Sequence, residues 1–423
     1  MANLELIKYT PMRAVVEGGS VRWEPDKLGR RLDDLPQIFW DSGEPWVEAN
    51  HWALTKATST LGGHIKTVTA LMKHLAAYAS WLESVELDWR HFPMINKHRA
   101  IVLFRGHLIE QRNRGSLASS TAKERMAAVI QFYRHAQTYG FVRPKAPMWK
   151  DRQVVVRYYD TVGFERSLMR IKSELSIPNR RREGLRLEDG LTPLRNEDAV
   201  RLLTYVKDRG QKELYLMLSL GVLTGARIET ITSLRVTDIE NAYPDVQTPD
   251  SYRLRVGPEV GVKTKFDVDG ELLVPKDLIE ELKEYTASND MRRLRRKDKA
   301  DKEDRGLLFL TVRGNPYESE SFNRLMTDLR RSTVKAGLRF IESFKFHHTR
   351  ATFGTWLMEV ALRVADVKAA VAFVKAAMLH KDERTTFLYV RFHREAPVKM
   401  EIAREFSAVF SGVVKRDWSQ YRA

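Results

Sequence analysis

Between residues 51 and 145 the apolar positions recur at the spacing of helices. One predicted helix carries its apolar face at Ile65, Val68, Leu71, Met72, Leu75, Tyr78 and Leu82. A second helix is predicted over 100–112. A third begins near Thr121, which has the spacing of a capping box with Glu124. The pattern therefore predicts a helical domain over 51–145.

A second pattern begins at Leu191. The stretch TPLRNEDAVRLLTYV opens with Thr and Pro and then becomes amphipathic, as the start of a helix does. Residues 252–274 alternate apolar and polar positions around Gly261 and Gly270, which predicts a small antiparallel sheet. Residues 319–423 return to helical spacing. The predicted fold is mainly α with a small antiparallel β-sheet, in the α+β class.

Three segments interrupt these patterns. Residues 1–50 mix short alternating stretches with Trp, Pro and Gly, and we expect an N-terminal extension of unknown role with some strand. Residues 146–190 are expected to form a basic linker, in which the run 178–190 is either solvated or a strap along a DNA backbone. Residues 291–306 carry a dense mixed-charge run, which favours an exposed, mobile loop.

Composition narrows the partner. The 423 residues are 43% hydrophobic, which is enough for two or three domains with cores of their own. Lys and Arg number 71 against 55 Asp and Glu, a formal net charge of +16. Such an excess is typical of nucleic-acid binding or of a highly charged, solvated surface. The chain has no cysteine, which excludes disulfides, thiolate metal sites and thiol nucleophiles.

Membrane, secretion and cofactor signals are missing from the sequence. The first residues lack a basic region followed by an apolar one, so no signal peptide is expected. The longest apolar stretch, 369–379, is too short to span a bilayer and contains Lys375. We expect a soluble, cytoplasmic protein with no membrane partner. No dinucleotide, phosphate-loop, zinc-protease or EF-hand motif occurs, so no cofactor and no metal are expected.

Four segments carry basic and hydroxyl residues in an ordered series: LTGARIETITSLR, VGVKTKFDV, FKFHHTRATFGTW and MLHKDERTTFLYV. Each segment alone has an ordinary interpretation, as a surface arginine, hairpin lysines, structural histidines or a half-buried tyrosine. The residues with chemical potential are, in chain order, Arg227, Lys263, Lys265, His347, Arg350, His380 and Tyr389.

Together the four segments resemble the tyrosine recombinase (phage integrase) family. That family has T-G-x-R at a helix start, a lysine on a β-hairpin and an H-x-x-R-x-T-F-x-T segment. A histidine nine residues before a tyrosine follows. The matching positions lie within 191–395, which the resemblance identifies as a catalytic domain. The helices at 51–145 resemble the family's SAM-like core-binding domain, and the two domains are expected to form a C-shaped DNA clamp.

The resemblance implies a reaction at phosphorus. Tyr389 would attack a phosphodiester and form a 3′-phosphotyrosyl bond, while Arg227 and Arg350 clamp the negative charge that builds on the phosphate oxygens. His380 would donate a hydrogen bond to the same phosphate. The phosphotyrosyl bond would keep the energy of the phosphoester, so rejoining needs neither ATP nor metal.

Proton transfer falls to other residues. A tyrosine hydroxyl, with an ordinary pKa of about 10, needs help at neutral pH, and the resemblance assigns this to His347. The departing 5′-oxygen needs a proton from a general acid. Lys263 is our choice because the family often has Lys-Thr at this turn, and Lys265 is its rival.

The sequence departs from the family pattern at three places. Thr230 stands where an acidic residue is usual, and Leu379 stands where glycine is usual before the second histidine. The interval from Arg350 to His380 is several residues longer than expected, which indicates an insertion near 360–377. No reacting group is lost, so we expect a divergent member that belongs to a mobile element.

The segment 396–423 is expected to be a helical tail. It carries apolar residues at Ile402, Phe406, Val409, Phe410, Val413 and Val414. They complete the core or, as the resemblance implies, dock on a neighbouring protomer.

The resemblance further implies double-stranded DNA as partner, a homo-tetramer on two DNA sites, association with the nucleoid, and a directionality factor or second recombinase. The rival hypotheses are a type IB topoisomerase-like enzyme and a non-catalytic DNA-binding accessory protein on the same fold.

Overall fold

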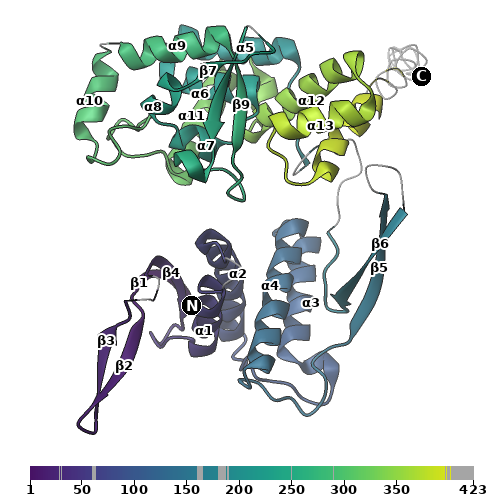
Figure 1. The fold of residues 1–423 in the computed structure, drawn as a ribbon. Helices are drawn as coiled ribbons and strands as arrows, with labels where there is room; N and C mark the ends of the chain where they lie inside the picture. The colour runs from purple at the N-terminus through teal and green to yellow at the C-terminus, as the bar shows by residue number, and fades with distance from the viewer. Residues whose placement is uncertain are drawn as a thin grey trace, which may run out of the picture. The chain divides into compact units, whose positions relative to one another are not determined.

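The computed structural model describes residues 1–401, except for 28, 30, 60–62, 160–164, 180–186, 188–189, 249, 289, 396 and 398–400. The chain divides into two compact units, unit 1 over Met1–Glu183 and unit 2 over Gly184–Ala423 (Figure 1). Each unit has a hydrophobic core of its own. The predicted tail beyond residue 401 lies outside the described residues.

Unit 1 begins with strands. The strand β1 (Asn3–Tyr9) pairs antiparallel with β4 (Leu32–Phe39), while β2 (Met12–Glu17) and β3 (Ser20–Pro25) form a separate hairpin. The side chain of Asn50 bonds both the backbone N–H and the carbonyl of Ile38 in β4, at 2.7 and 3.0 Å. Ile38 itself is fully buried. Strands β1 and β4 are therefore built into the core of unit 1, whereas the β2–β3 hairpin is largely exposed.

Helices form the rest of that core: α1 (Val47–Ala57), α2 (Ile65–Ser84), the short η1 (Asn96–His98), α3 (Ala100–Asn113) and α4 (Ser119–Thr138). Most of the predicted apolar face of α2 is buried, and the hydroxyl of Tyr78 lies 2.6 Å from that of Tyr133 in α4. The predicted capping box is wrong. The helix α4 begins before Thr121, and its N-cap, Ala118, has no hydroxyl with which to cap it.

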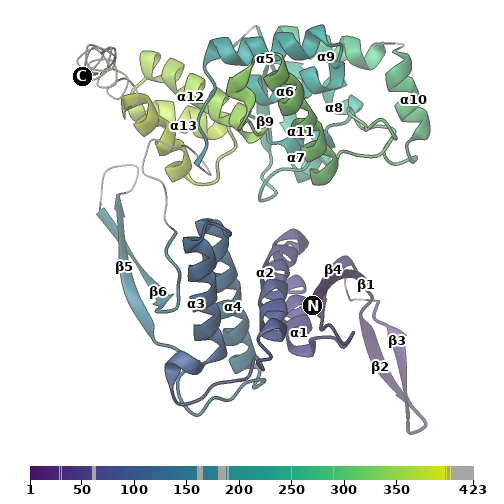
Figure 2. The same ribbon diagram turned by 180° about the vertical axis from the view of Figure 1, so that it is seen from behind.

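A two-stranded ribbon lies in the segment expected to be a linker. The strands β5 (Asp151–Tyr159) and β6 (Glu165–Ser173) pair antiparallel and stand beside α3 and α4 in both views (Figures 1 and 2). Most of the run 178–190, expected to be a solvated linker or a DNA strap, lies outside the described residues.

Unit 2 opens with helices and a small sheet. The helices are α5 (Asn196–Asp208), α6 (Lys212–Thr224), α7 (Ile228–Ser233) and α8 (Val236–Glu240). The sheet has the order β7-β8-β9 and is antiparallel, with β7 (Tyr243–Pro244), β8 (Ser251–Val256) and β9 (Gly270–Pro275). A short η3 (Pro258–Val260) follows β8. The sheet expected around 252–274 is thus present.

The remainder of unit 2 is helical. Its elements are α9 (Lys276–Ala287), α10 (Met291–Lys299), α11 (Ser319–Lys335), η4 (Arg339–Ile341), α12 (His347–Val364), α13 (Val367–Ala377) and a helix over 383–395. The segment 360–377, where an insertion is expected, forms the end of α12 and all of α13.

The loop expected over 291–306 is wrong in its first part, because residues 291–299 form α10. Arg and Lys favour helix, so the charge run has helical propensity. One of its cations is also anchored. Arg296 pairs with Glu213 of α6 at 2.7 Å, and both side chains are largely covered.

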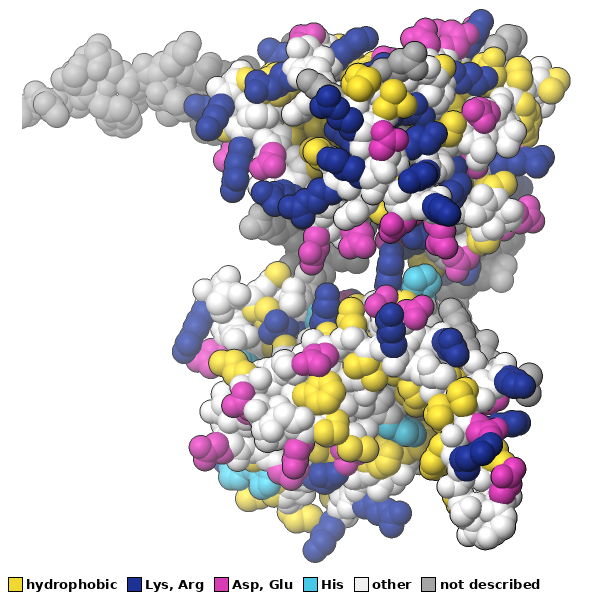
Figure 3. Space-filling view, turned by 90° about the vertical axis from the view of Figure 1, so that its left-hand side faces the viewer, with side chains coloured by type: hydrophobic (Ala, Val, Ile, Leu, Met, Phe, Trp, Pro, Cys, Tyr) yellow, Lys and Arg dark blue, Asp and Glu magenta, His cyan; other side chains and the backbone are white. Residues whose placement is uncertain are grey.

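The predicted fold class is confirmed: the described residues are mainly helical with small antiparallel sheets. None of the described helices is long and apolar enough to cross a membrane. Lys and Arg side chains are spread widely over the face of unit 2 that carries α10 (Figure 3). The net positive charge is therefore present on the folded surface.

Candidate active site

The chain turns sharply between α6 and α7, and Arg227 lies at this turn. Gly225 follows α6 with a left-handed φ of +67°, and Arg227 is the N-cap of α7. A Cβ on Gly225 would lie 2.5 Å from the ring of Phe353 in α12. Glycine is required here by both the backbone conformation and the close approach. The Thr-Gly pair of the motif thus fixes the half-buried Arg227 at the start of α7.

Arg350 connects two parts of the site from the first turn of α12. Its side chain donates to the carbonyl of Gly225 and to the carbonyl of Met378, both at 2.7 Å. These carbonyls lie two residues before Arg227 and His380, respectively. Arg350 is only 2% exposed, so in this conformation it holds the two segments together from inside the fold.

His380 is held by one of the paired threonines. Its Nδ1 lies 2.8 Å from the hydroxyl of Thr386, which is fully buried. The preceding residue, Leu379, has a left-handed φ of +51°, the conformation that glycine adopts without strain. Its side chain lies against β9 at Gly270, where a Cβ would overlap it. The glycine usual in the family is thus replaced by a leucine that packs on the sheet.

Tyr389 lies on the helix 383–395 and is fully buried. Its ring stacks beside that of His380, with centroids 6.0 Å apart and an interplanar angle of 27°. A Cβ on Gly354 of α12 would lie 2.5 Å from the Tyr389 ring and 2.6 Å from the sulfur of Met378. The glycine in the T-F-G-T segment therefore leaves the space that the tyrosine ring fills.

A cavity of about 450 Å³ lies beside these groups. It is lined by Arg227, Lys265, Phe266, Leu379, His380, Lys381, Asp382, Thr385 and Leu388. Three of these side chains are cations and one is a carboxylate. The ammonium groups of Lys265 and Lys381 lie 5.3 and 5.7 Å from the centre of the Phe266 ring. The excess of positive charge suits an anionic phosphodiester.

The two candidate lysines differ in position. The backbone N–H of Lys263 donates to the hydroxyl of Ser233 at 2.9 Å, and Lys263 is not among the residues that line the cavity. Phe266 and Asp267 then take left-handed φ values of +67° and +51° and turn the chain. Lys265, the rival of our first choice, lines the cavity with Arg227 and His380.

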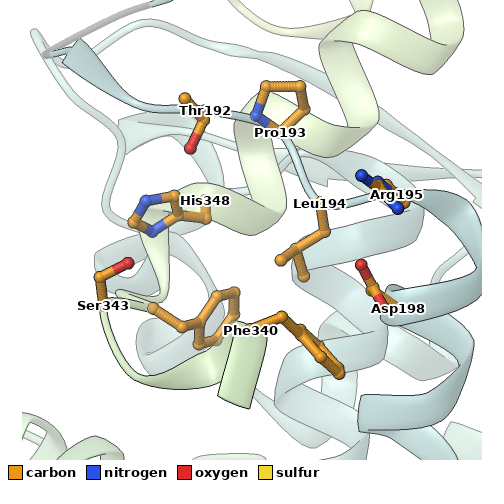
Figure 4. A pocket seen from close by; sticks show the side chains of 9 residues that line it. Thr192, Pro193, Leu194, Arg195, Asp198, Phe340, Ser343 and His348 are labelled. Atoms are coloured by element: carbon orange, nitrogen blue, oxygen red, sulfur yellow. The ribbon is translucent and has the colours of Figure 1, made fainter. Parts of the chain in front are cut away.

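Neither histidine of the pair at the start of α12 is among the residues that line this cavity. His347 is half-buried at the first position of α12. His348 lines another cavity of about 470 Å³, shown in Figure 4 with Thr192 and Ser343 near its ring and Asp198 on the opposite side. The Nδ1 of His348 lies 2.9 Å from the carbonyl oxygen of Lys345, and burial lowers the pKa of His348. This local bond gives His348 a structural role.

Sequence reasoning missed Lys381, Asp382 and Phe266 as cavity residues. The sequence offered one signal for them, their place next to two motifs: Phe266 follows Lys265 in the hairpin turn, and Lys381 and Asp382 follow His380. Thr386 was quoted only as part of the motif, and its contact with His380 required the fold.

The arrangement has the parts of a phosphoryl-transfer site. Cations line a cavity of suitable size together with His380, and the buried ring of Tyr389 stacks beside the His380 ring. Among the described residues no group of three His, Asp or Glu side chains could hold a metal ion.

Solved integrases resemble the chain at low identity. One is the Tn1549 transposon integrase in complex with circular intermediate DNA (13% identity, TM-score 0.49, 81% of this chain and 94% of that chain). Others are a lambda integrase dimer bound to a COC′ core site (12%, TM-score 0.45, 81% and 94%) and a lambda integrase tetramer bound to a Holliday junction (12%, TM-score 0.38, 84% and 92%). No curated protein matches the sequence.

The sequence model of the phage integrase family matches residues 193–395. This range contains every residue of the site, from Arg227 to Tyr389, and nearly all of the described part of unit 2. Residues 193–395 therefore form a domain of the phage integrase family, the tyrosine recombinases.

Proposed function

We propose that the protein is a site-specific DNA recombinase of a mobile element, which cleaves and rejoins strands through a 3′-phosphotyrosyl bond at Tyr389. The observation that carries the proposal is a cationic cavity lined by Arg227, Lys265 and His380, with the buried ring of Tyr389 stacked beside that of His380. Family membership supports the same reaction class, DNA strand transfer.

In the proposed reaction the hydroxyl oxygen of Tyr389 attacks the phosphorus, and the bond from phosphorus to the 5′-oxygen breaks. Arg227 and Arg350 stabilise the charge on the phosphate oxygens, and His380 donates to one of them. Thr386 would keep the His380 ring in orientation through its bond to Nδ1. The step exchanges one phosphoester bond for another and does not hydrolyse it, so the free 5′-hydroxyl can attack the phosphotyrosyl bond and reverse the step.

Two protons move in this step. The proton of Tyr389 passes to His347, and a lysine protonates the departing 5′-oxygen. We now favour Lys265 over Lys263 for the second role, because Lys265 lines the cavity beside Arg227.

The buried position of Tyr389 adds a requirement. An oxygen that is closed off by the fold cannot reach a phosphate in a duplex, so the helix 383–395 must shift before attack. Arg350 is covered in the same way. We propose that DNA binding in the cavity releases both groups.

The partner follows from the chemistry. Exchange between two duplexes breaks four strands, and each break needs a tyrosine. We therefore propose a homo-tetramer on two double-stranded DNA sites, with unit 1 and unit 2 both contacting the backbone. We propose that residues 51–145 bind DNA and that residues 191–395 catalyse the reaction, with the domain boundaries expected from the sequence.

Trapping of a covalent adduct tests the proposal. Wild type, Tyr389→Phe and the control Tyr317→Phe are expressed in a bacterial host that carries flanking DNA of the element, and the cells are lysed in SDS. We expect protein–DNA adducts from wild type and Tyr317→Phe and none from Tyr389→Phe. Adducts from Tyr389→Phe would refute the assignment of the nucleophile.

Two further assays separate the rival functions. Relaxation of supercoiled DNA without site preference would indicate a topoisomerase-like enzyme. Binding without any adduct, even on nicked substrates that prevent rejoining, would indicate a non-catalytic DNA-binding protein.

A further inference from the structure

The β5–β6 ribbon of unit 1 has described side chains exposed on both of its faces. From Asp151 to Val155 and from Met169 to Lys172 every described side chain is exposed. An isolated two-stranded ribbon is at best marginally stable in water. In this ribbon the exposed side chains add little stability by packing on the helical core. Packing within unit 1 therefore does not explain which side chains the ribbon exposes.

The register separates its side chains into two kinds. Arg152 pairs with Lys172, and Val154 pairs with Arg170. Paired and alternate residues share a face, so all three cations lie on one face, with no carboxylate at these positions. Pairing of Gln153 with Ile171 and of Val155 with Met169 places those four residues on the other face. Met169 and Ile171 are 63% and 65% exposed.

The cationic face is unfavourable for the ribbon alone. Arg152 and Lys172 lie directly opposite each other, and like charges at such positions destabilise a strand pair. Among the described residues none of the three cations forms an ion pair within unit 1 that would offset this repulsion. A polyanion bound across the face would remove the cost.

Both strands of the ribbon are fastened to the helical core at its base. Arg134 of α4 bonds both carboxylate oxygens of Asp151 at 3.0 Å. On the other strand, Leu175 is buried, and its carbonyl accepts from the side chain of Arg105 of α3 at 3.0 Å. The carboxylate of Glu174 accepts from the N–H of Lys150 at 2.9 Å. The base of the ribbon is thus set by the same helices that form the core of unit 1.

We propose that the face of Arg152, Arg170 and Lys172 binds the phosphate backbone of duplex DNA and adds a contact to those of the helical domain. Two-stranded ribbons have a width that DNA grooves admit, and cations spaced along them can follow a strand. The inference rests on the proposed function, because it assumes that duplex DNA is the partner of unit 1. The opposite, apolar face supplies a control.

The test measures binding of the full-length protein to a fluorescent random-sequence duplex over a series of KCl concentrations. The variant R152Q/R170Q/K172Q removes the three charges. We expect weaker binding and a slope of log K against log salt that is smaller in magnitude by about 2 to 3, since each lost phosphate contact removes nearly one counterion. The control V155T/M169T/I171T alters the opposite face and should keep the wild-type slope.

A conservative variant guards against misfolding. R152K/R170K keeps the charges and should restore binding to the wild-type level. Wild-type slope and affinity in the glutamine variant would overturn the inference. Loss of duplex binding in the apolar-face variant alone would overturn it too, because the DNA contact would then lie on the opposite face. Failure of the wild-type protein to bind any duplex would reject the proposed function itself, which separates the two outcomes.

Discussion

At the scale of single residues, the site is defined by contacts that orient the reacting groups. The bond to Thr386 orients His380, and the bonds of Arg350 to two carbonyls join segments that are far apart in the chain. Residue types and spacing predicted the candidate groups, because the chemistry requires these side chains in a fixed order. They could not separate Lys263 from Lys265, since the direction of the turn depends on the left-handed residues Phe266 and Asp267. Nor could they show that Tyr389 is buried.

The hydroxyl of Thr386 gives the first prediction. Thr386→Val keeps the shape of the side chain but removes the oxygen next to His380 Nδ1, a bond worth on the order of 1 kcal/mol. We expect cleavage of a nicked substrate to slow by roughly fivefold to tenfold, which corresponds to about that energy. Thr386→Ser should recover most of the rate. Equal rates for the valine variant and wild type would show that the bond does not position His380.

The backbone conformation of Leu379 gives the second prediction. Leu379→Ala loses the packing on β9 and keeps the left-handed strain, whereas Leu379→Gly loses the packing and relieves the strain of about 1 kcal/mol. We expect the glycine variant to be the more stable of the two in urea unfolding, the reverse of the usual order. A more stable alanine variant would contradict the strained conformation.

At the scale of elements, the helices were the part that hydrophobic spacing predicted well, as in α2. Hydrophobic spacing did not predict the elements that have no buried face. Strands β5 and β6 are exposed on both faces where they are described, so the alternation of apolar and basic residues over 169–172 does not mark a buried face. The charges of α10 indicated solvent exposure, while the Arg296–Glu213 pair that anchors it was visible only in the fold.

The contact between α12 and the helix 383–395 gives the third prediction. Gly354→Ala places a methyl group against the Tyr389 ring and the Met378 sulfur, so the two helices must separate, at a cost of about 1 to 3 kcal/mol. Gly106→Ala is the control, because Gly106 lies inside α3 with open space around its Cβ position. The control should stabilise the protein by about 0.5 to 1 kcal/mol. Denaturant unfolding measures both, and a neutral Gly354→Ala would contradict the tight packing of Tyr389.

At the scale of the whole molecule, the sequence predicted the fold class and the family, because both depend on patterns that extend over many residues. It did not predict how the N-terminal strands join the core of unit 1. That join depends on single contacts such as Asn50 with Ile38. Unit 1 also contains a partly buried histidine, His135, whose protonation affects the stability of the unit at low pH.

Unit 1 should lose stability in mild acid. Burial lowers the pKa of His135 to about 4, with further lowering by His51, whose Nδ1 is 3.0 Å from His135 Nε2, and by Lys56. The unfolded chain has a histidine pKa near 6.5, so it takes up the proton first as pH falls. The free energy of unfolding therefore decreases between about pH 6.5 and 4 and is unaffected above this window.

Tryptophan fluorescence reports on this transition, because most of the nine tryptophans lie in unit 1. His135→Gln has no imidazole to protonate and should show a weaker decrease over the same pH range. An unchanged pH profile in this variant would assign the acid sensitivity to other groups, among them His74 and His107, whose pKa values burial also lowers.

The most direct measurement is the identity of the residue that carries DNA. An adduct trapped in SDS is digested with nuclease and trypsin, and the peptides are analysed by mass spectrometry. Trypsin releases residues 385–391, TTFLYVR, in which Tyr389 is the one tyrosine. The account predicts a nucleotide attached through its 3′-phosphate to this peptide. A nucleotide on a different peptide, or an adduct through a 5′-phosphate, would contradict it.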